Sequence, residues 1–468
     1  MKHENELDSL INYNLIKAHL IASLVFLAIV FLAGMLYACQ FIYIFPFPGI
    51  EYLSPGRLRL LHTNGAVYGF IVNGFTGALY WAVPRLTGKR VMNEKYVGWF
   101  MFVALQAAVL ATAVGLLLGH AQAIEWGETP VYVDPFVVVW LLLSLVQFST
   151  PIYKHANEKP LYAANWYMIA GLVWVPMVYI MGNYVPAFFV PGVAGAAITG
   201  TWIHDAVGLY VTPIGWGLLY YFVPVILKKP VWSHALSLLG FWGLAFFYPL
   251  QGVHHFLWSP IPMYAQYAAV LSTIVLELAV VSVIVNFMMT LKGRGEALKE
   301  SIPLRWIFIG IVNYAITCFQ CAIQVLLTTQ KVIHFTDWVV GHAHLIMFGT
   351  FGFWILGFIA YLWPKVTHSQ TYSKSLDEWS FWLLLIGMEI MWVDLLAAGL
   401  MEGFTWWSLN PWMDSVRFAF PFWIVRALCG TMMSIGLICY LYNFYMTGRK
   451  KTISLVQSVE MGTVGGIL

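Results

Sequence analysis

Histidines within long apolar segments are the residues of this sequence best suited to chemistry. A polar ring without a partner is costly inside a membrane, so an ionisable residue there usually has a function. Imidazole is also a common ligand of transition metals. The histidines that lie within apolar segments are His62, His204, His254, His255, His334, His342 and His344. So many together favour a metal site over isolated packing residues.

The spacing of these histidines indicates more than one metal. His342 and His344 are two positions apart, so on an α-helix they project about 200° from one another and cannot share an ion. They can bind two ions on opposite sides of the helix. A haem held by two histidines has no open position, whereas a haem held by one histidine keeps a position for a ligand. Adjacent His254 and His255 differ by about 100° and, with a third imidazole such as His204, could hold copper through three nitrogens.

Long apolar helices must position these side chains. Of the 468 residues, 60% are hydrophobic and 10% are charged, a composition typical of multi-pass membrane proteins. A helix needs about 20 apolar residues to cross the hydrocarbon core. Segments of that length lie near 16–44, 58–84, 95–119, 134–153, 162–184, 195–226, 231–257, 263–291, 302–327, 338–363, 377–402 and 416–447. The sequence therefore predicts an all-α integral membrane protein of about twelve transmembrane helices. We expect one domain over 1–468, with its transmembrane core at about 16–447.

The cysteines and the start of the chain need no special chemistry. The 5 cysteines lie in apolar runs and indicate no disulfide framework. Cys318 and Cys321 form a C-x-x-C pattern within a predicted helix, and we interpret them as small core residues. The opening segment is polar and mixed in charge, so we expect that the first helix is not a cleaved signal sequence.

The distribution of basic residues predicts the orientation in the membrane. Most of the 24 Lys and Arg residues fall in alternate loops and at the two termini, which predicts that both termini are cytoplasmic. On that topology the second, sixth and tenth helices begin on the external side, and His62, His204, His342 and His344 lie in their first turns. His254 and His255 lie near the outer end of the seventh helix. These histidines are therefore expected to share one depth in the outer half of the membrane.

The motifs around these histidines resemble one known family. The runs LHTNGAVYGF, HDAVG, GVHHFLWSPIP and HFTDWVVGHAH, in this order, are similar to those of the catalytic subunit of haem–copper oxidases. The similarity spans about 57 to 426 and is strongest to the C family, the cbb-three-type cytochrome c oxidases. It implies a terminal respiratory oxidase subunit of a bacterial cytoplasmic membrane that reduces dioxygen to water and translocates protons.

The resemblance also implies the ligands of two b-type haems and one copper ion. His62 and His344 would bind the low-spin haem, and His342 would bind the high-spin haem. The copper ligands would be His204, His254 and His255. Tyr248 matches the active-site tyrosine that members link covalently to the histidine of helix six.

Further roles come from the same comparison of motifs. Arg57 would lie near the propionates of the low-spin haem, and His334 near haem propionates. Glu125 in the run EWGE would bind calcium. In the family a glutamate partners the proximal histidine of the high-spin haem, and this chain has Gln320 there, so we expect a higher haem potential or a shifted preference among gases. Independently of the resemblance, hydroxyl groups predict a cytoplasmic proton path: Ser237 lies three turns from Tyr248 on one face of helix seven, and Tyr220 and Tyr221 lie at the inner end of helix six.

Partners follow from what the chain lacks and what the resemblance implies. No C-x-x-C-H attachment motif for haem c occurs, so electrons must come from other subunits. The resemblance implies membrane-anchored cytochrome c subunits, with soluble cytochrome c as the electron donor. The lipid bilayer and dioxygen are the other expected partners, and nothing indicates nucleic acid.

Two other functions compete with oxygen reduction. Nitric oxide reductases have a similar histidine pattern, with iron in place of copper, but carry a glutamate four residues after the histidine of helix six and lack the tyrosine. This sequence has Gly208 at that position and has Tyr248, which favours oxygen. A metal-free transporter with proton-relaying histidines is the third possibility. It does not explain why His342 and His344 face apart while His254 and His255 are adjacent.

Overall fold

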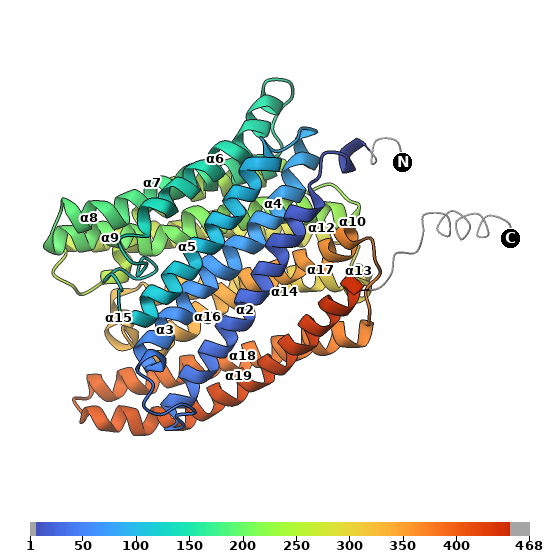
Figure 1. Ribbon diagram of the computed structural model, residues 1–468. Helices are drawn as coiled ribbons and strands as arrows, with labels where there is room; N and C mark the ends of the chain where they lie inside the picture. The colour runs from blue at the N-terminus through green and yellow to red at the C-terminus, as the bar shows by residue number, and fades with distance from the viewer. Residues whose placement is uncertain (1–5, 450–468) are drawn as a thin grey trace.

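The structure is a computed structural model that describes residues 6–449. Within this range the chain forms helices and connecting loops and no strand (Figure 1). The α-helices are α2 (Tyr13–Phe41), α3 (Pro55–Asn64), α4 (Val72–Thr87), α5 (Trp99–Leu118), α6 (Asp134–Ala156), α7 (Ala163–Tyr179), α8 (Val185–Phe188), α9 (Gly192–Ala206), α10 (Thr212–Leu227), α11 (His234–Phe247), α12 (Met263–Leu291), α13 (Glu296–Glu300), α14 (Ile302–Gln324), α15 (Leu327–Ile333), α16 (Asp337–His344), α17 (Phe353–Thr367), α18 (Lys374–Trp407) and α19 (Trp412–Arg449). The 3-10 turns are η1 (Glu51–Leu53), η6 (Tyr248–Leu250) and η7 (Gly252–Phe256). The π-helical segments are η2 (Gly65–Ile71), η3 (Glu94–Gly98), η4 (Ile180–Tyr184), η5 (Val207–Val211) and η8 (Leu345–Gly352).

Consecutive helical segments join into long spans that fit a membrane. Among the described residues 11 spans are long and apolar enough to cross one, and the segment His234–Leu250 is apolar but shorter. The start of α2 and the end of α19 lie at the same end of the bundle, which requires an even number of crossings and makes the shorter segment the twelfth (Figure 1). The predicted all-α membrane fold is confirmed. Lys2, Lys450 and Lys451, which entered the prediction of orientation, lie outside the described residues.

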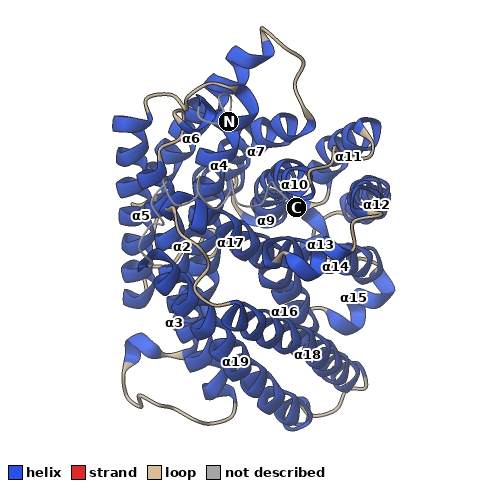
Figure 2. Cartoon of the chain, turned by 90° about the vertical axis from the view of Figure 1, so that its right-hand side faces the viewer, coloured by secondary structure: helices blue, strands red, loops and turns tan. Residues whose placement is uncertain are grey.

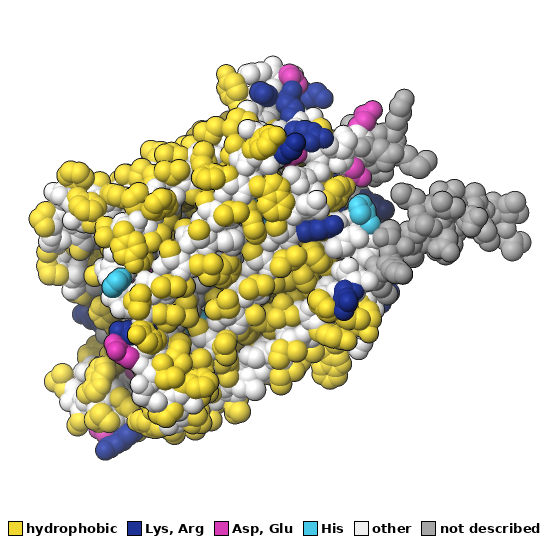
Figure 3. Space-filling model, in the orientation of Figure 1, with side chains coloured by type: hydrophobic (Ala, Val, Ile, Leu, Met, Phe, Trp, Pro, Cys, Tyr) yellow, Lys and Arg dark blue, Asp and Glu magenta, His cyan; other side chains and the backbone are white. Residues whose placement is uncertain are grey.

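The surface of the bundle matches a lipid environment. Figure 3 shows hydrophobic side chains over the flank, with Lys, Arg, Asp and Glu gathered toward the two ends. The three most buried spans are Pro55–Thr87, Gly192–Leu227 and Asp337–Thr367. These spans carry His62, His204 and the pair His342 and His344. The helix α17 lies inside the bundle, whereas α5, α12 and the α18–α19 pair lie at its edge (Figure 2). His62, His204, His342 and His344 are thus on the innermost spans, whereas His254 and His255 lie on η7.

The predicted helix over 231–257 is shorter than expected. The α-helix α11 ends at Phe247, and two 3-10 turns carry the chain through Tyr248, His254 and His255. Tyr248 still has α-helical backbone angles, but Pro249 after it has no backbone N–H to donate, so the hydrogen bond that would continue the helix is missing. The separation of about 100° predicted for His254 and His255 assumed an α-helix, and it does not apply here.

A π-helical segment follows the candidate ligand on each of the three buried spans. The segment η2 begins three residues after His62, η5 three residues after His204, and η8 directly after His344. A π-helical turn holds one more residue than an α turn and is frequent at functional sites. A π-helical segment thus lies between each candidate ligand and the rest of its span.

Candidate metal centres

Three imidazoles converge beside the C-terminal end of α11. His204 comes from α9, and His254 and His255 come from η7. One ligand atom from each ring lies within 4.8 Å of the others. The Nδ1 of His204 is 3.2 Å from the Nε2 of His255. Two nitrogens that bind one ion at about 2 Å in a roughly tetrahedral arrangement lie about 3.3 Å apart, so this spacing fits a shared metal.

Hydrogen bonds fix the orientation of these rings. The Nδ1 of His254 is 2.8 Å from the hydroxyl of Thr273, which itself donates to the Ala269 carbonyl. The hydroxyl therefore accepts from Nδ1–H, and the Nε2 of His254 keeps its lone pair for a metal. The Nε2 of His204 is 2.9 Å from the side-chain oxygen of Gln251. This partner leaves the Nδ1 of His204 as the ligand atom.

Tyr248 stacks against the same centre. Its ring lies 4.6 Å from the ring of His204, centroid to centroid, at an angle of 25°. The backbone of Gly208 lies under the tyrosine, and a Cβ added there would be 1.7 Å from the Tyr248 Cε1. Only glycine at 208 therefore lets Tyr248 reach His204.

A second pair of imidazoles faces a cavity between α2, η2 and η8. The rings of His62 and His344 are 5.9 Å apart, and both line a cavity of about 160 Å³. Because a ligand nitrogen lies about 2 Å from its metal, two rings on opposite sides of one ion have centres roughly 6 Å apart. The Nδ1 of His62 donates to the Val30 carbonyl at 2.9 Å, and that of His344 to the Val340 carbonyl at 2.8 Å. Each Nε2 is left for a metal, as axial ligation of one haem requires.

His342 points away from that cavity and toward the three-imidazole cluster. It interacts electrostatically with His204, His254 and His255. Its Nε2 is 3.5 Å from the thiol of Cys321, and its Nδ1 is buried without a hydrogen-bond partner in the described chain. The thiol interpreted as a plain core group is therefore beside a candidate ligand.

Gln320 does not pair with His342 in this structure. Its side-chain oxygen accepts a hydrogen bond from the Trp392 indole at 3.2 Å, and its amide nitrogen is buried without a partner among residues 6–449. The proposed influence of Gln320 on the proximal histidine stays a prediction.

The basic residue at the two-histidine cavity is Arg426, which the sequence reasoning did not select. Arg426 lines the cavity, is 8% exposed and has no ion-pair partner within residues 6–449. The guanidinium lies over the rings of Tyr37 and Phe41 at 5.8 Å and 5.1 Å. Its place inside a long apolar segment was the available signal, because a cation there needs an anionic partner. Arg57 instead forms an ion pair of 2.6 Å with Glu51 and does not line the cavity.

The loop with the run EWGE, which is predicted to be external, has one exposed and one buried carboxyl group. Glu125 is exposed, whereas Glu128 is buried, accepts a hydrogen bond from the Asn64 amide at 3.0 Å and lies 3.9 Å from Arg59. Burial raises the pKa of Glu128. The calcium site at Glu125 stays a prediction, and the acid that contacts the helix of His62 is Glu128.

His334 lies in the turn between α15 and α16. Its Nδ1 is 2.9 Å from the side-chain oxygen of Gln330, and burial lowers its pKa. It interacts electrostatically with His255, so it lies near the three-imidazole cluster.

The residues of the predicted proton path divide into two groups. The Ser237 hydroxyl donates to the His234 carbonyl at 2.6 Å, and the Ser237 carbonyl accepts from Tyr167. Tyr167 stacks on Tyr220 at 5.4 Å, so Ser237 and Tyr220 share one interface. Tyr221 interacts electrostatically with Arg85 and Tyr361 instead.

A bundle of membrane-spanning helices with two imidazole-lined centres defines a membrane metalloprotein. Comparison with known proteins makes this specific. A family model described as cytochrome c and quinol oxidase polypeptide I matches residues 14–432. The chain belongs to this family, whose members hold haem and copper in the catalytic subunit of an oxidase.

Individual relatives agree with the predicted resemblance. The chain is 30% identical to cytochrome c oxidase subunit 1 of Rhodobacter capsulatus, over 95% of this chain and 87% of that protein. It is 27% identical to the cbb3-type cytochrome c oxidase subunit CcoN1 of Stutzerimonas stutzeri, over 88% of this chain and 90% of that protein. A nitric oxide reductase subunit of the same organism is more distant, at 22% identity over 84% and 86% of the two chains. The solved structure of a haem–copper terminal oxidase dimer shares the fold, with a TM-score of 0.78, 17% identity and coverage of 94% of this chain and 85% of the other.

Proposed function

We propose that this chain is the catalytic subunit of a cytochrome c oxidase that reduces dioxygen to water and translocates protons. The observation that carries the proposal is the contact between Tyr248, Gly208 and the imidazole cluster. Tyr248 stacks on His204 only because position 208 has no side chain.

The donor sets favour a particular assignment of cofactors. Three imidazole nitrogens from His204, His254 and His255 suit copper. His62 and His344 would hold a low-spin b-type haem, and His342 would hold a high-spin b-type haem. When bound, these groups supply electron transfer and a position for oxygen.

The protein holds these ligands in fixed tautomers and supplies a proton. Thr273 orients His254, and the carbonyls of Val30 and Val340 orient His62 and His344. Such partners raise the basicity of a ligand and hold its ring in place. The phenol of Tyr248, stacked on His204, would hold a proton beside the cluster. The guanidinium of Arg426 is positioned to neutralise a haem carboxylate at the cavity.

The same packing argues against a nitric oxide reductase site. A glutamate at position 208 would have to occupy the space of the Tyr248 ring, since even a Cβ collides with it. The tyrosine and a glutamate one turn beyond His204 are therefore alternatives in this fold. A metal-free transporter is disfavoured by three ligand atoms within 4.8 Å, because neutral imidazoles gain little from such crowding without an ion.

The surroundings of the subunit follow from the family. We expect membrane-anchored cytochrome c subunits, soluble cytochrome c as donor, and a bacterial cytoplasmic membrane with both described chain ends on the cytoplasmic side. A calcium ion near Glu125 is proposed on the resemblance alone. Carboxylate oxygen suits calcium, and the buried Glu128 is a second candidate ligand.

The cofactor assignment is tested by the metal content and the reduced-minus-oxidised spectrum of the purified complex. One copper and two b-type haems for each chain support the proposal. Non-haem iron in place of copper would support the nitric oxide reductase alternative.

A further inference from the structure

Two buried carboxyl groups, apart from the metal-binding candidates, are in contact with one another. Asp337, at the start of α16, is 9% exposed, and Glu402, near the end of α18, is 8% exposed. The backbone N–H of Asp337 donates to the Oε2 of Glu402 at 2.8 Å, and the two side chains are also hydrogen-bonded to each other. An ionised carboxylate can only accept hydrogen bonds, so this contact between the side chains requires a proton on one of them.

Close packing of the backbone brings these two groups together. Gly399 and Gly403 lie on α18, close to Glu402 in the sequence. A Cβ at Gly399 would be 2.1 Å from the backbone nitrogen of Trp338, and a Cβ at Gly403 would be 1.8 Å from the carbonyl oxygen of Val332. The two glycines therefore allow α18 to lie directly against the chain on both sides of the start of α16. The contact between the carboxyl groups is set by this packing.

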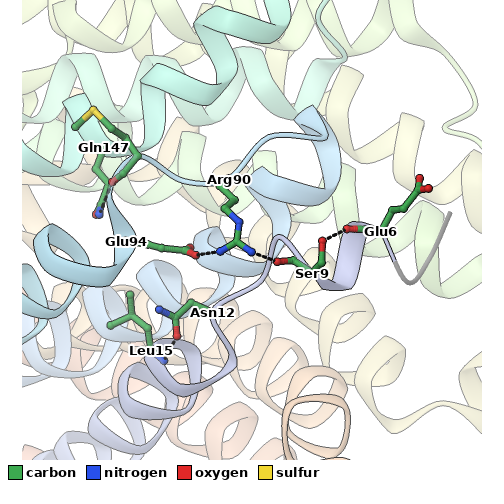
Figure 4. A network of polar contacts seen from close by, with 8 residues as sticks. Glu6, Ser9, Asn12, Leu15, Arg90, Glu94 and Gln147 are labelled. Carbon is green, nitrogen blue, oxygen red and sulfur yellow. Dashed lines mark hydrogen bonds and ion pairs between the residues drawn. The ribbon is translucent and has the colours of Figure 1, made fainter. Parts of the chain in front are cut away.

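Neither carboxyl group of this pair has an ion-pair partner among residues 6–449. The Trp423 indole donates to the Oδ2 of Asp337 at 2.7 Å. By contrast, the buried Glu94, at the other end of the bundle, is paired with Arg90 at 3.2 Å (Figure 4). Two adjacent carboxylates without a cation in contact disfavour the doubly ionised state, so such a pair holds a proton that a lone acid would lose.

Titratable and charged side chains of four helices face the pair, directly or through one intervening group. They are Asp394 of α18, Arg426 and Cys429 of α19, Tyr37 of α2 and Arg59 of α3. Arg426 interacts electrostatically with both Glu402 and Asp394. Lys331, on α15, lies over an indole ring at 4.8 Å instead, and His334 is hydrogen-bonded within its own turn. The cation that acts on the pair is therefore Arg426, which Asp394 shares.

The same side chains connect the pair to the two-histidine cavity. Arg426 and Tyr37 both line the cavity, and Tyr37 interacts electrostatically with Asp337. Arg426 also interacts electrostatically with His62 and His344. Charges inside a protein are screened much less than charges in water. A charge that changes at the cavity therefore changes the affinity of the carboxyl pair for its proton.

We propose that the pair of Asp337 and Glu402 binds a proton when an electron reaches the low-spin haem and releases it when the electron leaves. The inference rests on the proposed function, through the assignment of that haem to the two-histidine cavity. An added electron lowers the positive charge in the cavity, so the pair holds its proton more tightly. One electron and up to one proton move in each cycle. The proton exchanges with water at this end of the bundle, where Phe335, two residues before Asp337, is 87% exposed.

The test is a redox titration of the low-spin haem in the whole purified complex, at several pH values and without oxygen. Because the proton favours the reduced state, the midpoint potential of the wild type should fall as the pH rises. Glu402→Gln should reduce this slope at least two-fold. Glutamine still accepts from the Asp337 N–H, and its amide donates to the Asp337 carboxylate, which then stays ionised. Asp337→Asn keeps an acceptor for Trp423 and should reduce the slope in the same way.

Glu94→Gln is the matched control, because Glu94 is an equally buried acid at the other end of the bundle. It should keep the slope of the wild type. An unchanged haem spectrum shows that a variant is folded. A wild-type potential that does not depend on pH, or a wild-type slope in both Glu402→Gln and Asp337→Asn, would overturn the proposal.

A second readout observes the carboxyl group itself. The infrared difference between the reduced and oxidised complex should contain the C=O band of a protonated carboxyl group in the wild type and lose it in Glu402→Gln. The same band in Glu402→Gln would assign the proton to another group. Neither measurement needs turnover. A complex that reduced nitric oxide in place of oxygen would contradict the proposed function and still show the slope, whereas an active oxidase with no effect of Glu402→Gln and Asp337→Asn would contradict this inference alone.

Discussion

The ring of Tyr248 lies directly over the backbone of Gly208, at a distance that excludes any side chain at that position. A Cβ at 208 would lie 1.7 Å from the Cε1 and 2.5 Å from the Cζ of the tyrosine. Real Cβ contacts are never this short, so one of the two groups would have to move. Tyr248 in turn stacks on His204. The absence of a side chain on one span therefore sets the position of the phenol beside the imidazole cluster.

The first prediction concerns this contact. Gly208→Ala should displace Tyr248 from His204 and lower oxygen turnover by on the order of 100-fold, since a 1 Å misplacement near reacting groups can cost that much. Turnover of the purified complex measures it. Gly56→Ala is the matched control, because a Cβ at Gly56 meets no atom within 4 Å. Wild-type turnover in Gly208→Ala would show that the position of Tyr248 does not matter.

The second prediction concerns the partner of a copper-ligand candidate. Thr273→Val removes the hydroxyl that accepts from the Nδ1 of His254 and should weaken copper binding by about 10–100-fold. Copper retained against a chelator measures it. The control is Ser272→Ala, since the Ser272 hydroxyl only donates to the Ala269 carbonyl. Equal copper retention in Thr273→Val and wild type would mean that this hydrogen bond does not support the ligand.

The third prediction concerns the buried cation at the two-histidine cavity. Arg426→Gln should lower the content or the midpoint potential of the low-spin haem, because a buried cation stabilises an anionic group and the more reduced state beside it. Haem spectra with redox titration measure it. Arg417→Gln is the control, since Arg417 is an exposed residue paired with Asp414 at 3.1 Å. If both variants kept the wild-type spectrum and potential, Arg426 would have no role at the haem.

The fourth prediction concerns pH and the external loop. Burial raises the pKa of Glu128 above its ordinary value of 4.5, so the folded state binds this proton more tightly than the unfolded state. The contribution of Glu128 to stability is therefore full below pH 4.5 and is lost as the pH rises through the raised pKa. Glu128→Gln removes this titration, so the unfolding temperature should fall less as the pH rises above 4.5. A parallel curve in Glu128→Gln and wild type would assign the dependence to other groups.

Most of the fold was predictable because apolar segments long enough for lipid leave few alternatives. The predicted 263–291 coincides with α12, and the predicted 16–44 differs from α2 by three residues at each end. The exception lies near Pro249. The apolar sequence continues through this residue, but proline has no N–H for a helical hydrogen bond, and the α-helix ends at Phe247. The π-helical segments were not predictable, since their apolar pattern is the same as that of an α-helix.

The candidate site was predictable where residue type alone limits the role. Histidine in an apolar helix has few functions, so the convergence of His204, His254 and His255 agrees with the sequence reasoning. Charged residues were harder. Arg57 was selected by its motif, whereas Arg426 lines the cavity and was counted only as an external charge. Glu125 was selected from EWGE. Glu128 in the same run is buried and Glu125 is exposed, a difference that only the three-dimensional structure shows.

The most direct test of the oxidase function is turnover of the purified complex with oxygen and with nitric oxide, each supplied with reduced cytochrome c. We expect rapid oxygen consumption that is lost in Tyr248→Phe, and slow nitric oxide reduction. Rapid production of nitrous oxide that persists in Tyr248→Phe, with little oxygen consumption, would contradict the proposed function.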